Sequence, residues 1–272
     1  MKAVTAIGIA ASCVSLLVAV VLEGGNPMAL FNVPALLIVV GGTFGVVMAS
    51  TEFSSAMAMP KLMARSFKGC EVDCADAARQ MVALAEKARR EGLLALESEI
   101  AGIEDAYARK GVQLVVDGAD PELARAILQA EIDGMAQRHA ANAHLFMTAG
   151  GFAPTLGILG TVLSLVHVLE NLSSPASLGH SIAGAFLATL YGVGTANVVY
   201  IPVANKLKEM TKQELNYREL LLEGILSIQA GENPRLLAEK LETFVPPHER
   251  GAGESATSAG AKVAPSPALE AA

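Results

Sequence analysis

Tryptophan is absent from this chain of 272 residues, and aromatic residues make up only 4% of it. A packed aromatic core is therefore not expected. Charged residues are also scarce, at 17%, where a soluble domain has about a quarter. Hydrophobic residues make up 52% and the mean hydropathy is positive, so the composition predicts a membrane protein. The net charge of −7 is spread along the chain, and the missing basic face argues against nucleic acid as a partner.

Sites for disulfides, metals and catalysis are also missing. The three cysteines, Cys13, Cys70 and Cys74, are odd in number and lack the spacing of a disulfide framework. A metal site at Cys70 and Cys74 would need two further ligands, and His139 and His144, five residues apart, are poorly placed to share a helix face. No phosphate-binding loop, HExxH or GxSxG motif occurs. We expect reduced thiols, no metal, no cofactor, no catalytic residues and no enzyme activity.

Long uncharged stretches dominate what is present. A bilayer core of about 30 Å needs about 20 helical residues, and four stretches reach that length: Ala3–Leu22, Val33–Thr51, Thr148–Leu169 and Gly179–Ile201. They predict an all-α polytopic membrane protein with four transmembrane helices. The first stretch follows Lys2 as a secretory signal would, but no small-residue cleavage site ends it. The "AASC" at 10–13 lacks the usual leucine of a lipoprotein cleavage box, so we expect a retained helix.

The distribution of lysine and arginine among the connecting segments predicts how the chain is oriented in the membrane. The connections 23–32 and 170–178 contain neither, whereas the segment 52–147 contains eleven. Positive residues stay on the cytoplasmic side, which places both termini and this segment in the cytoplasm. The chain then divides into spans one and two (1–51), a helical cytoplasmic domain (52–147), spans three and four (148–202), a cytoplasmic C-terminal helix (203–245) and a disordered Pro/Gly/Ser/Ala tail (246–272).

The cytoplasmic part reads as helical. Met81, Leu84, Ala85 and Ala88 form one apolar stripe. A further helix begins at Pro121, where a preceding aspartate can cap it. No strong break follows, so that helix is predicted to continue into the third span. The last helix is predicted to be interrupted at "GENPR", residues 231–235.

Spans three and four carry polar residues that lipid does not require. The stretch "GGFAPTLGILGTVLSLV", residues 150–166, places Pro154 beside Thr155. The proline lacks a backbone donor and leaves a carbonyl unpaired. Free carbonyls and hydroxyls inside a bundle can line a water-filled path. Helix packing explains the glycines, and bonding to the preceding turn explains about half of the hydroxyls.

No span contains Asp, Glu, Lys or Arg. Ion sites in membranes usually use an ionisable group, so an ion-conducting chain of this kind needs a carboxylate from a partner. A solitary secondary transporter would need internal repeats and its own charged midplane site, and neither occurs. A structural scaffold would explain the glycines but not the hydroxyls beside the proline.

Several motifs together resemble the MotA family, the channel-forming stator subunit of the bacterial flagellar motor. They are "LIVVGGTFG", "EKARREGLLALE", "APTLGILGT", "FLATLYG", "PVANKL" and "EGILSIQAGENPR", within residues 3 to about 245. The resemblance implies a homopentamer in the bacterial inner membrane around two MotB-like subunits, a 5:2 complex. Each MotB-like subunit has one span with an essential aspartate. Ion flow turns the ring and drives the rotor. The distantly related ExbB/TolQ-type energisers usually have three spans, which argues against that alternative.

The resemblance also implies roles for single residues. The prolines matching Pro154 and Pro202 couple ion flow to movement, and the threonine matching Thr189 lines the ion path. The charges matching Arg89, Arg90 and Glu97 engage the rotor protein FliG. From the residues alone, these three charges form a solvated helix face.

The transported ion is predicted to be the proton, with sodium as the alternative. The sodium-type relatives, PomA and MotP, usually have a Thr–Thr pair where this chain has Ala188 and Thr189. They also usually have a small apolar residue at Thr155, and many have Asp at Asn32. Thr161 points to sodium, because sodium types carry threonine there. Sodium needs several oxygen ligands, and the loss of one at residue 188 weakens such a site.

Overall fold

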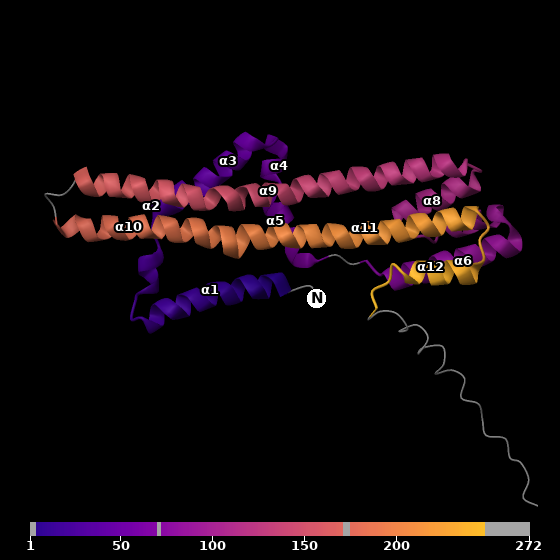
Figure 1. The fold of residues 1–272 in the computed structure, drawn as a ribbon, viewed down its shortest axis with the longest axis horizontal. Coiled ribbons are helices and arrows are strands. Elements are labelled where there is room, and N and C mark those ends of the chain that lie inside the picture. The colour runs from indigo at the N-terminus through magenta and orange to yellow at the C-terminus, as the bar shows by residue number, and fades with distance from the viewer. Residues whose placement is uncertain (1–3, 70–71, 171–174, 248–272) are drawn as a thin grey trace, which may run out of the picture. The chain divides into compact units, whose positions relative to one another are not determined.

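The structure is a computed structural model that describes residues 4–69, 72–170 and 175–247 (Figure 1). Helices make up its regular structure, and none of the described residues forms a strand. The prediction of a disordered tail over 246–272 falls outside the described residues except for the first two positions, and Cys70 also falls outside them. The chain forms two compact units. The first comprises residues 1–71 and 133–214, and the second comprises residues 72–132 and 215–272. The boundaries predicted from the membrane topology stay predictions.

The first unit holds the apolar helices. Its elements are α1 (Val4–Leu22), η1 (Pro27–Leu30), α2 (Val33–Leu36), the π-helical turn η2 (Leu37–Gly41), α3 (Gly42–Ser50), α4 (Phe53–Met57), α5 (Met59–Lys68), most of α9 (Pro121–Glu170), α10 (Pro175–Gly194), the π-helical turn η4 (Thr195–Tyr200) and the start of α11 (Ile201–Gln229).

Four helical segments of the described chain are long and apolar enough to cross a membrane. They are Thr5–Leu22, Val33–Ser50, and windows within Pro121–Glu170 and Ser181–Gln229. This confirms the predicted fold class of four transmembrane helices. None of the 18 residues of Thr5–Leu22 is fully buried within this chain, although Ile9 packs against a neighbouring hydrophobic cluster of the same unit.

Helices α9 and α10 lie side by side in this unit (Figure 1) because small residues line their contact. A Cβ atom added to Gly157 would lie 2.9 Å from the carbonyl oxygen of Ala188, and one added to Gly192 would lie 2.6 Å from that of Ala153. Only glycine permits this approach of two backbones, which is how helices gain contact area in lipid. Below, we call Gly157, Gly160 and Gly192 the glycine contact.

The second unit has a hydrophobic core of its own. Its elements are α6 (Cys74–Glu91), η3 (Leu93–Leu96), α7 (Glu97–Ile100), α8 (Ala106–Val116), the first turns of α9, the end of α11 and α12 (Pro234–Glu242). Helices α6 and α12 lie side by side (Figure 1). The predicted stripe on α6 is buried, which confirms it, and the core comprises Met81, Leu84, Ala85, Ala88, Leu96, Tyr107, Val112, Leu128, Ile132, Leu220, Ile225, Leu237 and Leu241.

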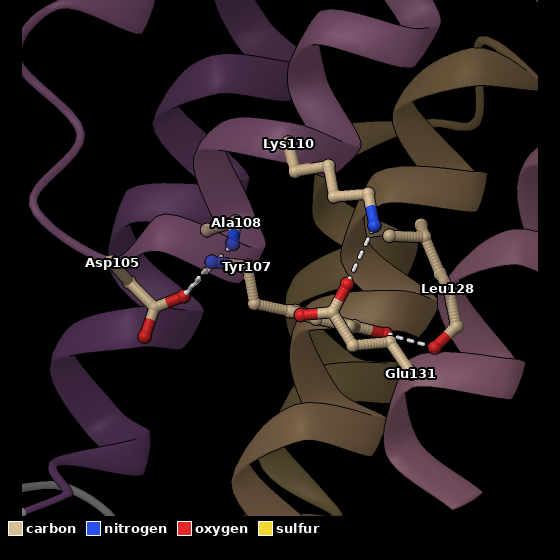
Figure 2. A network of polar contacts seen from close by, with 6 residues as sticks. All are labelled: Asp105, Tyr107, Ala108, Lys110, Leu128 and Glu131. Carbon is tan, nitrogen blue, oxygen red and sulfur yellow. Dashed lines mark hydrogen bonds and ion pairs between the residues drawn. The ribbon is translucent and has the colours of Figure 1, made fainter. Parts of the chain in front are cut away.

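Tyr107 joins α8 to two other helices of this unit. Its hydroxyl donates to the carbonyl of Leu128 on α9 at 3.4 Å (Figure 2). The guanidinium of Arg218 on α11 lies 4.9 Å from the centre of the Tyr107 ring. Burial raises the pKa of the Tyr107 hydroxyl, and the charge of Arg218 opposes that shift. Beside it, Lys110 donates to Glu131 at 2.7 Å.

Backbone capping agrees with the sequence. Asp105 Oδ1 accepts the N–H groups of Tyr107 and Ala108 at 2.9 and 2.8 Å and so begins α8 (Figure 2). Asp120 caps α9 as predicted, since its Oδ1 accepts the Glu122 N–H at 3.0 Å. Helix α9 then continues for 50 residues without a break. The predicted interruption at 231–235 is also confirmed, because α11 ends at Gln229 and α12 begins at Pro234.

Gly224 offers a test of the packing in the second unit. A Cβ atom there would lie 2.7 Å from Cγ and 3.0 Å from Cβ of Met81. Gly224→Ala is expected to destabilise the protein by about 1–3 kcal/mol through overpacking. Gly134→Ala is the matched control, because its Cβ would meet only the end of the Arg138 side chain, at 3.3 Å. There the gain in helix propensity, about 0.5–1 kcal/mol, is expected to stabilise the protein. Thermal unfolding midpoints that move in the same direction for both variants would contradict this packing.

Candidate functional site

Two hydroxyls meet between α9 and α10. The Oγ1 atoms of Thr161 and Thr189 lie 2.6 Å apart, and both side chains are half-buried. The Thr161 hydroxyl can donate to the carbonyl of Gly157 at 2.9 Å, and either hydroxyl can be the donor in the contact between the two threonines. The carbonyl of Ala185 lies 3.4 Å from the same Thr161 oxygen. Four neutral oxygens, two from each helix, therefore gather at one level of the bundle.

Ala188 lies next to this oxygen cluster but faces the glycine contact. Its side chain is 1% exposed. A Cβ atom on Gly160 would lie 2.8 Å from the Ala188 Cβ, which shows how closely α9 passes. Within a single chain, then, the Ala188 methyl group is a packing element. The role in the ion path that was predicted for this position stays a prediction.

Pro154 and Thr155 lie in α9 apart from the oxygen cluster. Thr155 is exposed, and its hydroxyl donates to the carbonyl of Phe152 in the same helix at 2.7 Å. Pro154 has no N–H to donate to the carbonyl of Gly150 one turn earlier. The six residues from Thr155 to Thr161 correspond to roughly 9 Å along a helix. The structure therefore does not bring Thr155 together with Thr161 and Thr189.

Pro202 follows a π-helical turn. Residues Thr195–Tyr200 form the wider η4 turn, and Pro202 is the second residue of α11. A proline clashes with the carbonyl four residues before it in a regular α-helix, and a π turn shifts that carbonyl. Within η4, Thr195 donates to the carbonyl of Tyr191 at 2.6 Å and Asn197 donates to that of Val193 at 2.9 Å. Such turns occur frequently at functional sites.

Tyr191 ties α10 to the start of the second span. Its hydroxyl donates to the carbonyl of Leu30 and accepts the N–H of Asn32 at 3.0 Å. Asn32 Oδ1 in turn accepts the N–H of Ala35 at 3.0 Å and caps α2. Sequence reasoning missed this contact, since it used Asn32 only as an indicator of the ion and did not consider Tyr191. A tyrosine in a membrane span that needs a partner for its hydroxyl is the signal that could have revealed it.

Charge is absent from this region. The uncharged stretches leave hydroxyls, amides and carbonyls as the polar groups near Thr161 and Thr189. Among the described residues, no group of histidine, cysteine, aspartate and glutamate side chains could hold a metal ion. The arrangement can pass a proton along hydroxyls or give a cation a few weak ligands. It cannot hold a fixed negative charge opposite the ion.

The charges predicted to face the rotor lie in the second unit. Arg89 and Arg90 are exposed in the last turn of α6, and Glu97 is exposed at the first residue of α7. The two arginines line a surface hollow together with Arg235 of α12, which sequence reasoning did not select. Glu97 does not line that hollow.

Comparisons with known proteins agree with this architecture. Residues 99–220 match the model of the MotA/TolQ/ExbB proton channel family. Motility protein A of Bacillus subtilis (strain 168) is 39% identical over 90% of this chain and 91% of its own length. Two solved structures are similar. One is MotAB of C. jejuni, with a TM-score of 0.86 and 30% identity over 91% of this chain and 97% of that one. The other is the flagellar MotAB stator complex of Bacillus subtilis, with a TM-score of 0.82 and 39% identity over 90% of this chain and 96% of that one.

Proposed function

Because this chain belongs to the motility protein A family of flagellar stator subunits, we propose that it couples ion flow across the bacterial inner membrane to rotation of the flagellar rotor. The similar solved structures are MotAB complexes, which supports a MotB-like partner. The proposed assembly is a ring of five copies around two partner subunits, with both termini of each copy in the cytoplasm.

One observation carries the proposal, namely that the oxygen cluster around Thr161 and Thr189 is polar but neutral. An ion that crosses the bilayer needs a compensating charge, since hydrocarbon does not solvate it. The spans of this chain have no carboxylate. We therefore assign the charge to an aspartate in the single span of the MotB-like partner, and Thr189 to the wall of the path beside it.

The two prolines are proposed to couple ion flow to movement. Pro154 leaves the Gly150 carbonyl without its helical donor, and Pro202 follows the η4 turn. A helix that lacks one backbone hydrogen bond bends at lower cost than a regular helix. Each proline thus supports a hinge, one in α9 and one where α11 begins.

Protons are the proposed ion. Ala188 offers a buried methyl group where a second threonine would add an oxygen ligand. Thr161 and Thr189 bond to each other, so part of their hydrogen-bonding capacity is already used. Sodium is the second candidate, because the Ala185 carbonyl lies 3.4 Å from Thr161 Oγ1 and adds an oxygen to the same cluster.

The rotor contact is proposed at Arg89, Arg90 and Glu97, with FliG as the partner. All three side chains are exposed. Exposed charges steer and register a transient contact without a strongly adhesive apolar patch, which suits a surface that must engage and release as the rotor turns.

Replacement of sodium by potassium at constant pH is expected to leave the swimming speed of cells driven by this chain unchanged, because the proposed ion is the proton. A protonophore that collapses the pH gradient and the membrane potential is the positive control and should stop motility. The measurement is swimming speed or tethered-cell rotation. Loss of rotation in potassium medium would contradict the proton and favour sodium.

Pro154→Ala is expected to leave assembly intact and to impair rotation. Alanine supplies the N–H that the Gly150 carbonyl lacks. This stabilises the helical conformation of α9 by about 3 kcal/mol, the usual cost of proline inside a helix, and so makes bending at this position less favourable. Pro121→Ala is the matched control, since the first residue of a helix has no intrahelical acceptor for its N–H. Rotation of tethered cells and co-purification of the partner are the measurements. Normal rotation of the Pro154→Ala motor would exclude the hinge.

A further inference from the structure

The short helix α5 lies against the ends of spans three and four. Its Met59 is buried, and Leu62 and Met63 pack against the same cluster, whose other members include Ala143, Phe146, Ala149, Val203, Ala204 and Leu207. These partners sit where the uncharged stretches 148–169 and 179–201 meet the charged segments beyond them. Side-chain packing thus places α5 at the level of the membrane surface.

The opposite face of α5 is basic. Lys61, Arg65 and Lys68 occupy positions i, i+4 and i+7, which share one face of a helix, and all three are exposed. We call these residues the basic stripe. Neither Lys61 nor Lys68 forms an ion pair with another described residue. Arg65 lies 3.8 Å from Glu214, yet its side chain is 54% exposed.

Nearby acidic groups do not neutralise the stripe. On α11, Glu214 is shared between Arg65 and His139, which lies 3.7 Å away, and the exposed Glu209 accepts from Gln213. Lys206 and Lys208 follow the fourth span on the same helix and add positive charge.

Exposed apolar residues precede the stripe. In α4, between the second span and α5, Phe53 is 64% exposed and Met57 is 56% exposed. Because the apolar face of α5 packs against the protein, Phe53 and Met57 are the apolar side chains that can reach lipid here. Exposed apolar side chains next to exposed basic ones are the combination that binds a segment to the membrane interface.

We propose that the basic stripe binds the headgroups of anionic phospholipids in the leaflet where the second span ends. Basic residues at the membrane surface attract anionic lipids, and the attraction falls off within a Debye length. A ring of subunits would repeat the stripe and hold an anionic lipid belt at its cytoplasmic rim. The inference rests on the membrane topology of the proposed function and is independent of ion flow.

The test uses the complete chain with its partner subunit, reconstituted in bilayer discs of equal parts phosphatidylglycerol and phosphatidylcholine. Lipid that stays bound after transfer to detergent is quantified by mass spectrometry. The wild-type complex is expected to retain phosphatidylglycerol preferentially. Lys61→Gln/Lys68→Gln is expected to lower that preference by about fivefold for each lysine removed, and Lys61→Arg/Lys68→Arg is expected to keep it.

Arg125→Gln/Arg235→Gln removes the same charge from exposed sites of the second unit and is expected to keep the preference. The proposal is overturned by equal retention of the two lipids in the wild type, by an unchanged preference in the glutamine variant, or by an equal loss in the control. Should the glutamine variant fail to assemble, added salt must lower the wild-type preference instead, and a preference unaffected by salt overturns the proposal. A complex that retains phosphatidylglycerol but conducts no ions would refute the proposed function alone.

Discussion

The cost of charge in hydrocarbon governs the spans of this chain. A carboxylate or an ammonium group inside a bilayer costs several kcal/mol unless it is paired or hydrated, and the four uncharged stretches contain neither. The polar groups that remain between α9 and α10 are hydroxyls and carbonyls, with Thr161 and Thr189 in direct contact. Because these groups are neutral and hydrogen-bond to one another, they are stable in the membrane without a second subunit. They can take part in ion transport when another subunit places a charge beside them.

The same constraint links packing to chemistry. Lipid tails are as apolar as leucine, so helices in a membrane associate through close van der Waals contact and interhelical hydrogen bonds. The glycine contact lets the backbones of α9 and α10 approach, and this approach brings the Thr161 and Thr189 oxygens to 2.6 Å. A larger residue at Gly157 or Gly192 would separate the helices and break the hydroxyl pair. The glycines and the hydroxyls are thus parts of one arrangement.

Much of the fold is readable from the sequence, because length, hydropathy and capping are local properties. The four spans, the uninterrupted helix from Pro121, the cap at Asp120 and the break before Pro234 are all predicted and confirmed. Contacts between distant residues are not readable in this way. Tyr191 contacts Leu30 and Asn32, which lie about 160 positions earlier in the chain. Arg218 on α11 likewise contacts the ring of Tyr107 on α8. The π-helical turns cannot be predicted from the sequence either, because hydrophobic periodicity does not distinguish them from an α-helix. For the site, the sequence predicts the neutral hydroxyls but not that Thr161 and Thr189 touch, that Ala188 packs inward or that Thr155 lies apart.

Ion flux into liposomes tests the central claim, that this chain supplies a neutral path and a partner supplies the charge. The chain would be reconstituted alone, with its MotB-like partner, and with a partner whose membrane aspartate is replaced by asparagine. A potassium diffusion potential would drive uptake, with a pH-sensitive dye inside. The account predicts flux only for the complex that retains the aspartate. Flux through the chain alone, or through the asparagine complex at the same rate, would contradict it.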